Sequence, residues 1–113
     1  MKILNEKNYK TVLDSGELAF IFFTSKGCHL CVKLKPVLKK LEKEFKTKLE
    51  FYSCDIDEQK ALAKVFIKDE GVPTGFVSKG GSVFKIKDPK TPDDDCWYSE
   101  KYLKDLIEAL VKG

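Results

Sequence analysis

The chain has 113 residues, of which 42% are hydrophobic and 35% are charged, and its formal net charge is +3. This length suits one domain over residues 1–113 that buries roughly two-thirds of its unfolded surface, enough to fold without disulfide or metal cross-links. The small net charge and the lack of arginine argue against nucleic-acid binding, and no apolar run approaches the ~20 residues of a membrane span. The polar sequence after residues 1–3 lacks the apolar segment of a signal peptide, so we expect a cytoplasmic protein.

The first part of the chain alternates between helix and strand patterns. Residues 6–14 have the pattern of a short amphipathic helix, with or without a short strand at residues 2–4 before it. Residues 18–24 form an almost unbroken apolar run, which is typical of a strand buried on both faces of a sheet. Residues 29–46 repeat apolar side chains every three or four positions, which predicts a helix with a lysine-rich outer face. Pro36 lies inside this helix, and we expect the helix to bend there.

The middle of the chain predicts one more strand and one more helix. Residues 49–54 are rich in strand-forming side chains. Asp57 can cap a helix that runs to about Lys68 and is ended by Gly71. The side chains expected to face the core from this helix are Ala61, Leu62, Val65 and Phe66.

A hairpin and a final helix complete the pattern. Strands at residues 75–78 and 83–87 flank a glycine-containing turn, which predicts an antiparallel pair. After an acidic stretch at 88–98, Ser99 can cap a helix whose inward side chains are Leu103, Leu106, Ile107 and Leu110. Parallel crossovers followed by a hairpin predict an α/β protein, with a central mixed sheet of four to five strands and helices on both faces.

Four cysteines, at positions 28, 31, 54 and 96, suit catalysis or metal binding in a cytoplasmic chain better than a disulfide framework. Cys54 ends a predicted strand and is most simply a small buried hydrophobic residue. Cys96, in the acidic stretch, is expected to be a more open loop thiol, with a third redox thiol or an intermolecular link as the alternative. Trp97 and Tyr98 are expected to pack against the sheet rather than to line a partner site.

Cys28 and Cys31 lie where a predicted strand passes into a predicted helix. The unpaired N–H groups and the dipole at a helix start stabilise a thiolate, and Lys26 adds positive charge. Cys31 is one turn inside the helix and therefore less exposed. This asymmetry predicts that Cys28 attacks a substrate disulfide and that Cys31 then resolves the mixed disulfide.

The sequence resembles the thioredoxin family in three motifs: the C-x-x-C between strand and helix, Pro36 five residues later, and Val72-Pro73-Thr74 before the next strand. The resemblance implies a thioredoxin fold and reaction with protein disulfides. It also implies a cis Pro73 facing the cysteines, and a Val72 backbone that pairs with substrate as an added strand. The residues that it implies for substrate contact are Gly27, His29, Leu30, Val72, Pro73 and Thr74. It implies a disulfide-containing protein and a flavin-dependent thioredoxin reductase or similar thiol donor as partners, with no cofactor or metal bound.

Three positions differ from the family pattern. Gly27 stands where thioredoxins usually have tryptophan, and Phe22 stands where they usually have a buried aspartate that relays protons to the second cysteine. Another group or water must then deprotonate Cys31. His29 is the only histidine of the chain; as an imidazolium near Cys28 it would favour the thiolate and a more oxidising disulfide, and otherwise it is an exposed residue with no role.

Four alternatives stay open at this stage. In the first, Cys28 and Cys31 are packed structural thiols. In the second, they bind zinc, which needs two further ligands at tetrahedral distance. A glutaredoxin-like, glutathione-dependent enzyme would share the C-x-x-C and the Val-Pro pair. A thioredoxin-like adaptor or transport accessory protein would tolerate loss of Cys28 and would show no disulfide reduction.

Overall fold

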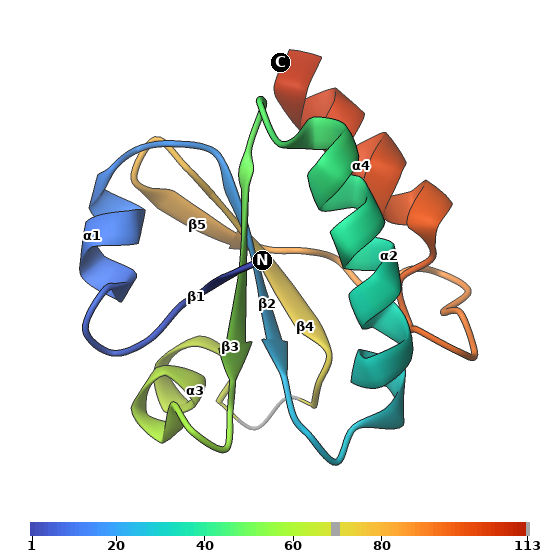
Figure 1. Cartoon of the computed structure of the whole chain (residues 1–113), viewed down its shortest axis with the longest axis horizontal. Coiled ribbons are helices and arrows are strands. Elements are labelled where there is room, and N and C mark those ends of the chain that lie inside the picture. The colour runs from blue at the N-terminus through green and yellow to red at the C-terminus, as the bar shows by residue number, and fades with distance from the viewer. Residues whose placement is uncertain (69–70, 113) are drawn as a thin grey trace.

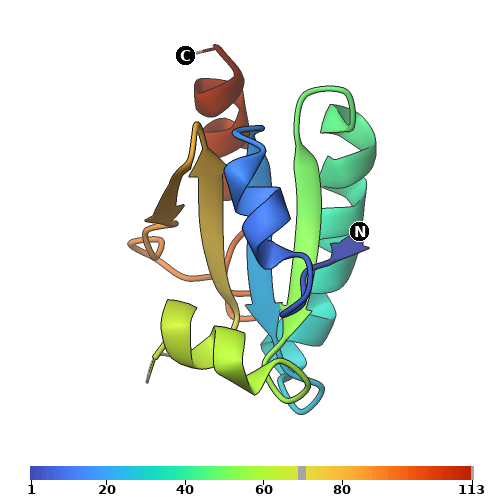
Figure 2. The ribbon, with the colours of Figure 1, turned by 90° about the vertical axis from the view of Figure 1, so that its left-hand side faces the viewer.

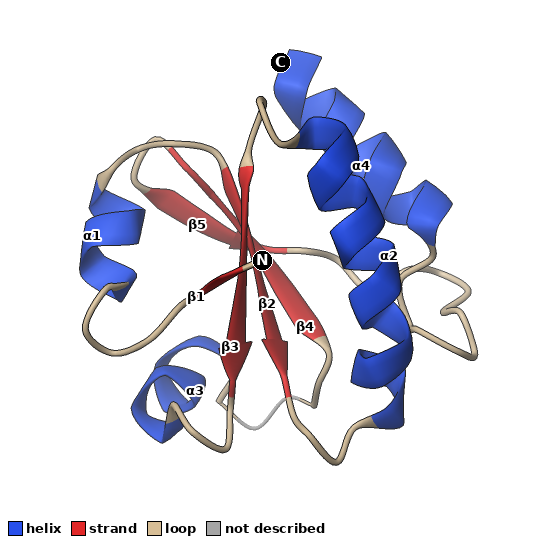
Figure 3. Ribbon diagram, in the orientation of Figure 1, coloured by secondary structure: helices blue, strands red, loops and turns tan. Residues whose placement is uncertain are grey.

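The computed structural model describes residues 1–68 and 71–112, and its five strands form one mixed sheet in the order β1-β3-β2-β4-β5 (Figures 1 and 3). The strands are β1 (Lys2–Ile3), β2 (Ala19–Thr24), β3 (Glu50–Asp55), β4 (Thr74–Lys79) and β5 (Ser82–Lys85). Parallel pairing joins β3 to β1 and β2, and antiparallel pairing joins β4 to β2 and β5. The α/β class and the mixed sheet of four to five strands are thereby confirmed.

Helices cover both faces of this sheet, as the sequence predicts. The helices are α1 (Tyr9–Asp14), α2 (His29–Phe45), α3 (Lys60–Phe66) and α4 (Glu100–Lys112). Helices α2 and α4 lie together on one face, and α1 and α3 lie on the other, in front of the sheet in Figure 2 (Figures 1 and 2).

The apolar run of β2 supplies both hydrophobic cores, because alternate side chains of a strand point to opposite faces. Phe20 and Phe22 pack under α2 and α4, whereas Ile21 and Phe23 pack under α1 and α3. All four side chains are fully buried. Burying one such side chain contributes about 1.5–3 kcal/mol, so this strand is a large part of the stability of the fold.

Helix α2 has the buried stripe that its sequence predicts, formed by Cys31, Leu34, Leu38 and Leu41. The helix continues through Pro36 to Phe45, and the bend expected at the proline stays a prediction. Its lysine-rich outer face includes two ion pairs to α4, from Lys40 to Glu100 (3.1 Å) and from Glu44 to Lys104 (2.9 Å).

Helix α3 differs from the prediction at its start and on one face. It begins at Lys60 rather than at Asp57, because the side chain of Asp55 caps a turn before it by accepting the N–H groups of Asp57 and Glu58. Leu62 is buried and Phe66 packs on the core, as expected. Ala61 and Val65, expected to face inward, are instead exposed.

The helix ends near the expected residue. Lys68 has a positive φ of 50°, which is incompatible with a further helical turn. The stretch between Lys68 and Gly71, including part of the predicted helix stop, lies outside the described residues.

The acidic stretch before α4 folds back onto the core. The side chain of Asp93 accepts the N–H groups of Asp95 and Cys96, and the backbones of Asp93 and Trp97 exchange two hydrogen bonds. Tyr98 is fully buried, which confirms its predicted packing, and its hydroxyl accepts the N–H of Gly75 at 3.3 Å. The hydroxyl of Ser99 accepts the N–H of Tyr102, as expected of a helix cap.

Candidate redox site

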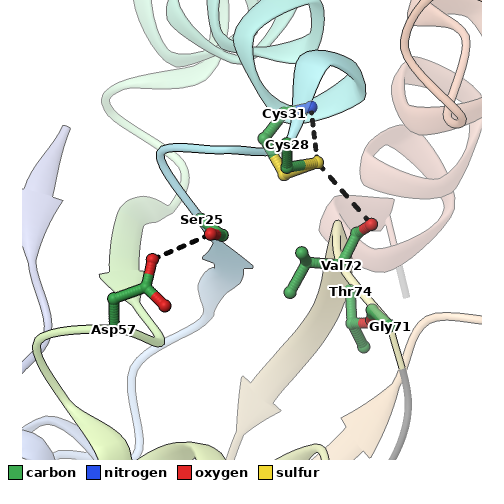
Figure 4. The surroundings of a disulfide bond; sticks show 7 residues. All are labelled: Ser25, Cys28, Cys31, Asp57, Gly71, Val72 and Thr74. Atoms are coloured by element: carbon green, nitrogen blue, oxygen red, sulfur yellow. Dashed lines mark hydrogen bonds between the residues drawn. A yellow bond between two sulfur atoms is a disulfide. The ribbon is translucent and has the colours of Figure 1, made fainter.

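The sulfur atoms of Cys28 and Cys31 are bonded to each other at the junction of β2 and α2, with their Cα atoms 5.2 Å apart (Figure 4). Cys28 is the N-cap of α2, and its Sγ accepts a hydrogen bond from the backbone N–H of Cys31 at 3.1 Å. A thiolate at this position would receive the same bond together with the field of the helix dipole. The helix-start position predicted for Cys28 is therefore confirmed.

The two cysteines differ in access to solvent. Cys28 is half-buried, whereas only 5% of Cys31 is exposed. An incoming disulfide can therefore reach Cys28 but not Cys31. The difference has the direction expected for an attacking and a resolving thiol.

The segment Val72-Pro73-Thr74 lies opposite Cys28, and the Val72–Pro73 peptide bond is cis as expected (Figure 4). The carbonyl oxygen of Val72 is 3.7 Å from Sγ of Cys28. The hydroxyl of Thr74 donates to the carbonyl oxygen of Gly71 at 2.5 Å, which fixes the loop before β4. The fold thus brings together two motifs more than forty residues apart in the chain.

A cavity of about 450 Å³ opens beside this loop, and four of its lining residues, Gly71, Lys85, Asp88 and Trp97, were not assigned to the site from the sequence. Its lining residues are Leu30, Gly71, Val72, Pro73, Thr74, Lys85, Asp88 and Trp97. Trp97 and Asp88 come from the acidic stretch and are joined by a hydrogen bond from Nε1 to Oδ1 of 3.0 Å. The sequence feature that pointed to these residues was the position of the only tryptophan beside an acidic run.

The other predicted contact residues are exposed beside the disulfide. Gly27 and His29 are exposed, and no atom lies within 4 Å of the place where a Cβ of Gly27 would be. The surface before Cys28 is therefore flat and open where the family usually has a tryptophan. Lys26 forms an ion pair of 3.4 Å with Glu58, so its charge near the disulfide is partly compensated.

Phe22 lies in the core beneath the disulfide, where it packs edge-to-face on Phe20 and Tyr98 with ring centroids 5.9 and 6.0 Å away. It pairs with Gly75 across β2 and β4. A Cβ on Gly75 would lie 2.7 Å from the ring of Phe22 and 2.8 Å from Ile86, closer than real contacts allow. Phe22 and Gly75 therefore fit each other, and this part of the core holds no carboxylate.

Cys54 and Cys96 are free thiols inside the fold. Burial raises the pKa of Cys54 to about 11, and the carboxylate of Asp55 adds to the shift. Burial and the carboxylate of Asp93 raise the pKa of Cys96 to about 11 as well. The prediction for Cys54 is confirmed.

The expectation that Cys96 is an open loop thiol is wrong. Its side chain packs in the core under α2 and α4 and lies 3.1 Å from the carbonyl oxygen of Tyr98. Trp97, its neighbour, packs against the same core, which confirms its predicted packing, and it also lines the cavity. The alternative that it lines a partner site stays a prediction.

Within residues 1–68 and 71–112, no three His, Cys, Asp or Glu side chains are grouped so that they could hold a metal ion. In the same part of the chain, no helix has the length and apolar character needed to cross a bilayer.

A disulfide at a helix start, facing a cis-proline loop on a mixed sheet, is the arrangement found in the class of thiol–disulfide oxidoreductases. The chain belongs to the thioredoxin family, because the family model described as Thioredoxin matches residues 1–95. The C-x-x-C pair in this family supports thiol–disulfide oxidoreductase chemistry.

Individual relatives agree with this assignment. The chain is 35% identical to Thioredoxin H5 of Arabidopsis thaliana over 83 residues, which is 74% of this chain and 68% of the relative. It is 28% identical to Thioredoxin of Borreliella burgdorferi over 102 residues, covering 78% of this chain and 87% of the relative.

Solved structures share the fold at lower identity. Mitochondrial thioredoxin 3 from Saccharomyces cerevisiae, in its oxidised form, matches with a TM-score of 0.78 and 22% identity over 96% of this chain and 94% of that one. The J-Trx1 fragment of ERdj5 matches with a TM-score of 0.82 and 22% identity, over 99% of this chain and 52% of the fragment.

Proposed function

We propose that this chain reduces or exchanges disulfides of other proteins through the Cys28–Cys31 pair. In the reducing direction, the Cys28 thiolate attacks one sulfur of a substrate disulfide, forms a mixed disulfide and releases the other substrate sulfur as a thiolate that takes up a proton. The Cys31 thiolate then attacks Sγ of Cys28, which restores the Cys28–Cys31 disulfide and releases the second substrate thiol. Two electrons pass to the substrate.

The observation that carries this proposal is the half-buried Cys28 at the start of α2, with the Val72 carbonyl 3.7 Å from its sulfur. An extended substrate segment can pair with the backbone of Val72 as an added strand, which brings its disulfide to Cys28. Gly27, His29, Leu30, Pro73 and Thr74 surround that segment. Trp97 and Asp88 form the far wall of the cavity and extend the contact surface.

The proposal includes the partners and the place of action. A disulfide-containing protein is the substrate, and a flavin-dependent thioredoxin reductase or a similar thiol donor regenerates the dithiol. The reaction takes place in the cytoplasm, where thiols are kept reduced. Residues 1–113 act as one domain.

The test is the reduction of insulin by dithiothreitol, followed as turbidity, with Cys28→Ser, Cys31→Ser and Cys96→Ser variants. We expect no activity above background for Cys28→Ser, an accumulating mixed disulfide for Cys31→Ser and unchanged turnover for Cys96→Ser, because Cys96 is buried away from the pair. An inactive wild-type chain whose biological role survives Cys28→Ser would instead indicate an adaptor. Turnover that requires glutathione would indicate a glutaredoxin-like enzyme.

Trp97 allows a second, independent measurement because it is the only tryptophan. In a Cys31→Ser background, a substrate peptide trapped on Cys28 should change the fluorescence of Trp97 if the segment lies in the cavity that this ring lines. A trapped peptide that leaves the emission unchanged would remove Trp97 from the contact surface.

A further inference from the structure

The proposed reaction requires Cys31 to lose its proton at a place that water hardly reaches. A thiolate, and not a thiol, attacks the mixed disulfide, and burial disfavours the charged form of a thiol. Cys31 is only 5% exposed, and Phe22, which stands at the family's proton-relay position, is a fully buried apolar side chain. The thiol proton of Cys31 must therefore leave by a path that does not cross the apolar core.

A second cavity, of about 360 Å³, reaches Cys31 from the side opposite the substrate loop. It is lined by Met1, Thr24, Ser25, Lys26, Cys31, Val32, Lys35, Leu38, Ser53 and Asp55. A water molecule takes about 30 Å³, so this space holds several. The cavity therefore connects Cys31 to solvent along a lining that includes the polar side chains of Thr24, Ser25, Ser53 and Asp55.

The sheet supplies the polar wall of this cavity. Phe22 pairs with Ser53, and Thr24 pairs with Asp55, across the parallel strands β2 and β3. Because alternate side chains share a face, Thr24, Ser53 and Asp55 lie on the same face as Phe20, Phe22 and Phe51. This face is apolar under the middle of α2 and becomes polar under its first turn, beside Cys31.

Four groups on this cavity can exchange protons in addition to the thiol. The amino group of Met1 forms an ion pair with Glu42 at 3.1 Å, and Lys26 forms one with Glu58 at 3.4 Å. Lys35 and Asp55 remain, and Asp55 is the only carboxylate among the lining residues. A carboxylate can accept the thiol proton, whereas a charged lysine can only stabilise the thiolate.

The carboxylate of Asp55 is held in place by the backbone. Its Oδ1 accepts the N–H of Asp57 at 2.8 Å and the N–H of Glu58 at 3.3 Å. Both bonds engage the same oxygen, and no hydrogen bond joins Oδ2 to another of the described residues. The side chain is half-buried, which limits its motion without isolating it from water.

We infer that Asp55 accepts the proton of Cys31, through water in this cavity, when Cys31 attacks the mixed disulfide. This inference rests on the proposed function. The S–H bond of Cys31 breaks and the proton passes to Oδ2 of Asp55. The thiolate forms the bond to Sγ of Cys28, the bond from Cys28 to the substrate breaks, and the substrate leaves as a thiolate that is protonated by solvent. Asp55 then returns its proton to bulk water, and the positive charge of Lys35 stabilises the intermediate thiolate.

The test follows one molecule of 5,5′-dithiobis(2-nitrobenzoate) reacting with the reduced chain. Attack by Cys28 releases the first thionitrobenzoate, and attack by Cys31 releases the second. This leaving group needs no proton, so the second phase reports the deprotonation of Cys31. Asp55→Asn keeps an oxygen that can accept the backbone N–H groups but loses the proton acceptor.

We expect Asp55→Asn to slow the second phase at least about a hundredfold at pH 7, the lower end of general-base effects, and to move its pH profile upward. The first phase should not change. Asp57→Asn is the matched control, because Asp57 lies on the same turn but is exposed and accepts a bond from Ser25. It should leave both phases unchanged.

Several results would overturn the inference. One is an unchanged rate of the second phase in Asp55→Asn. Another is an equal loss of this rate in Asp57→Asn, and a third is a loss of this rate in Lys35→Gln that Asp55→Asn does not show. Thermal melts of all variants exclude unfolding, and Asp55→Ser, which keeps an acceptor oxygen, replaces the asparagine variant if that one is unstable. A wild-type chain without a second phase would contradict the proposed function itself, whereas a normal wild type with an unaffected Asp55→Asn contradicts only the role of Asp55.

Discussion

The four cysteines of this chain occupy two kinds of environment. Cys28 and Cys31 lie where β2 passes into α2, and their sulfurs are bonded. Cys54 lies inside β3 and is fully buried, and Cys96 is packed between the acidic stretch and the core. Burial raises the pKa of both free thiols to about 11. The same side chain therefore behaves as a redox group or as a small hydrophobic residue according to its place in the fold.

The difference depends on what surrounds each sulfur. Cys28 receives a backbone N–H of the helix start, which favours negative charge. Cys54 and Cys96 have a carboxylate nearby, from Asp55 and Asp93, which opposes negative charge. Burial, and after it the negative charge of these carboxylates, keeps Cys54 and Cys96 protonated, whereas the N–H group of the helix start favours the thiolate of Cys28.

The largest expected effect is on thiol alkylation. At pH 8, a thiol with a pKa of about 11 is ionised in only about one molecule in a thousand, so Cys54 and Cys96 should stay unmodified by iodoacetamide in the native, reduced chain. Cys28 should react first. Mass spectrometry of the intact chain would give the number of modified thiols, and all four thiols should react after denaturation. Rapid native modification of Cys96 would show that the two environments are not distinct.

A smaller effect is expected on stability at high pH. The raised pKa of Cys54 and Cys96 means that the unfolded chain loses these protons before the folded chain does, from the ordinary value of 9.0 upward. The contribution of each thiol is therefore complete below pH 9 and is lost as the pH rises to about 11. Thermal melts from pH 8 to 11 should show a shallower decline for a Cys54→Ala, Cys96→Ala double variant than for the wild type. Parallel curves would contradict the assignment.

The smallest expected effect is on the field around Cys28. Lys26 is 79% exposed and is paired with Glu58, and exposed ion pairs contribute about 0–1 kcal/mol. Lys26→Gln should change the pKa of the Cys28 thiol by less than about half a unit, measured as thiolate absorbance in a Cys31→Ser background. A larger drop in reactivity would mean that charge, more than the helix start, separates the reactive pair from the buried pair.

Most elements of the fold could be predicted because they depend on local patterns. The unbroken apolar run of β2 and the three- to four-residue repeat of α2 each determine one element by periodicity alone. Helix α3 was placed less well, because the capping role of Asp55 depends on a side chain from the preceding strand. Ala61 and Val65, which were expected to face the core from this helix, lie at the surface.

The candidate site was predicted in part. The C-x-x-C and the Val-Pro pair are sequence motifs, and the structure places the carbonyl oxygen of Val72 3.7 Å from the sulfur of Cys28. Asp88 and Asp55 were missed because nothing local connects them to the cysteines, and Trp97 was expected to pack against the sheet rather than to line a partner site. The fit of Gly75 to Phe22 also depends on the register of β2 and β4, which the sequence does not state.

The sequence by itself determined the helix start at Cys28, the alternation of strands and helices, and the family. These features depend on neighbouring residues, whose spacing is fixed by the chain. Only the tertiary structure decided that Cys96 is buried, that Trp97 lines the cavity beside the cis-proline loop, and that Asp55 shares a cavity with Cys31. Each of these depends on which face of an element packs against a distant one, and that is set by pairing across the sheet rather than by order along the chain.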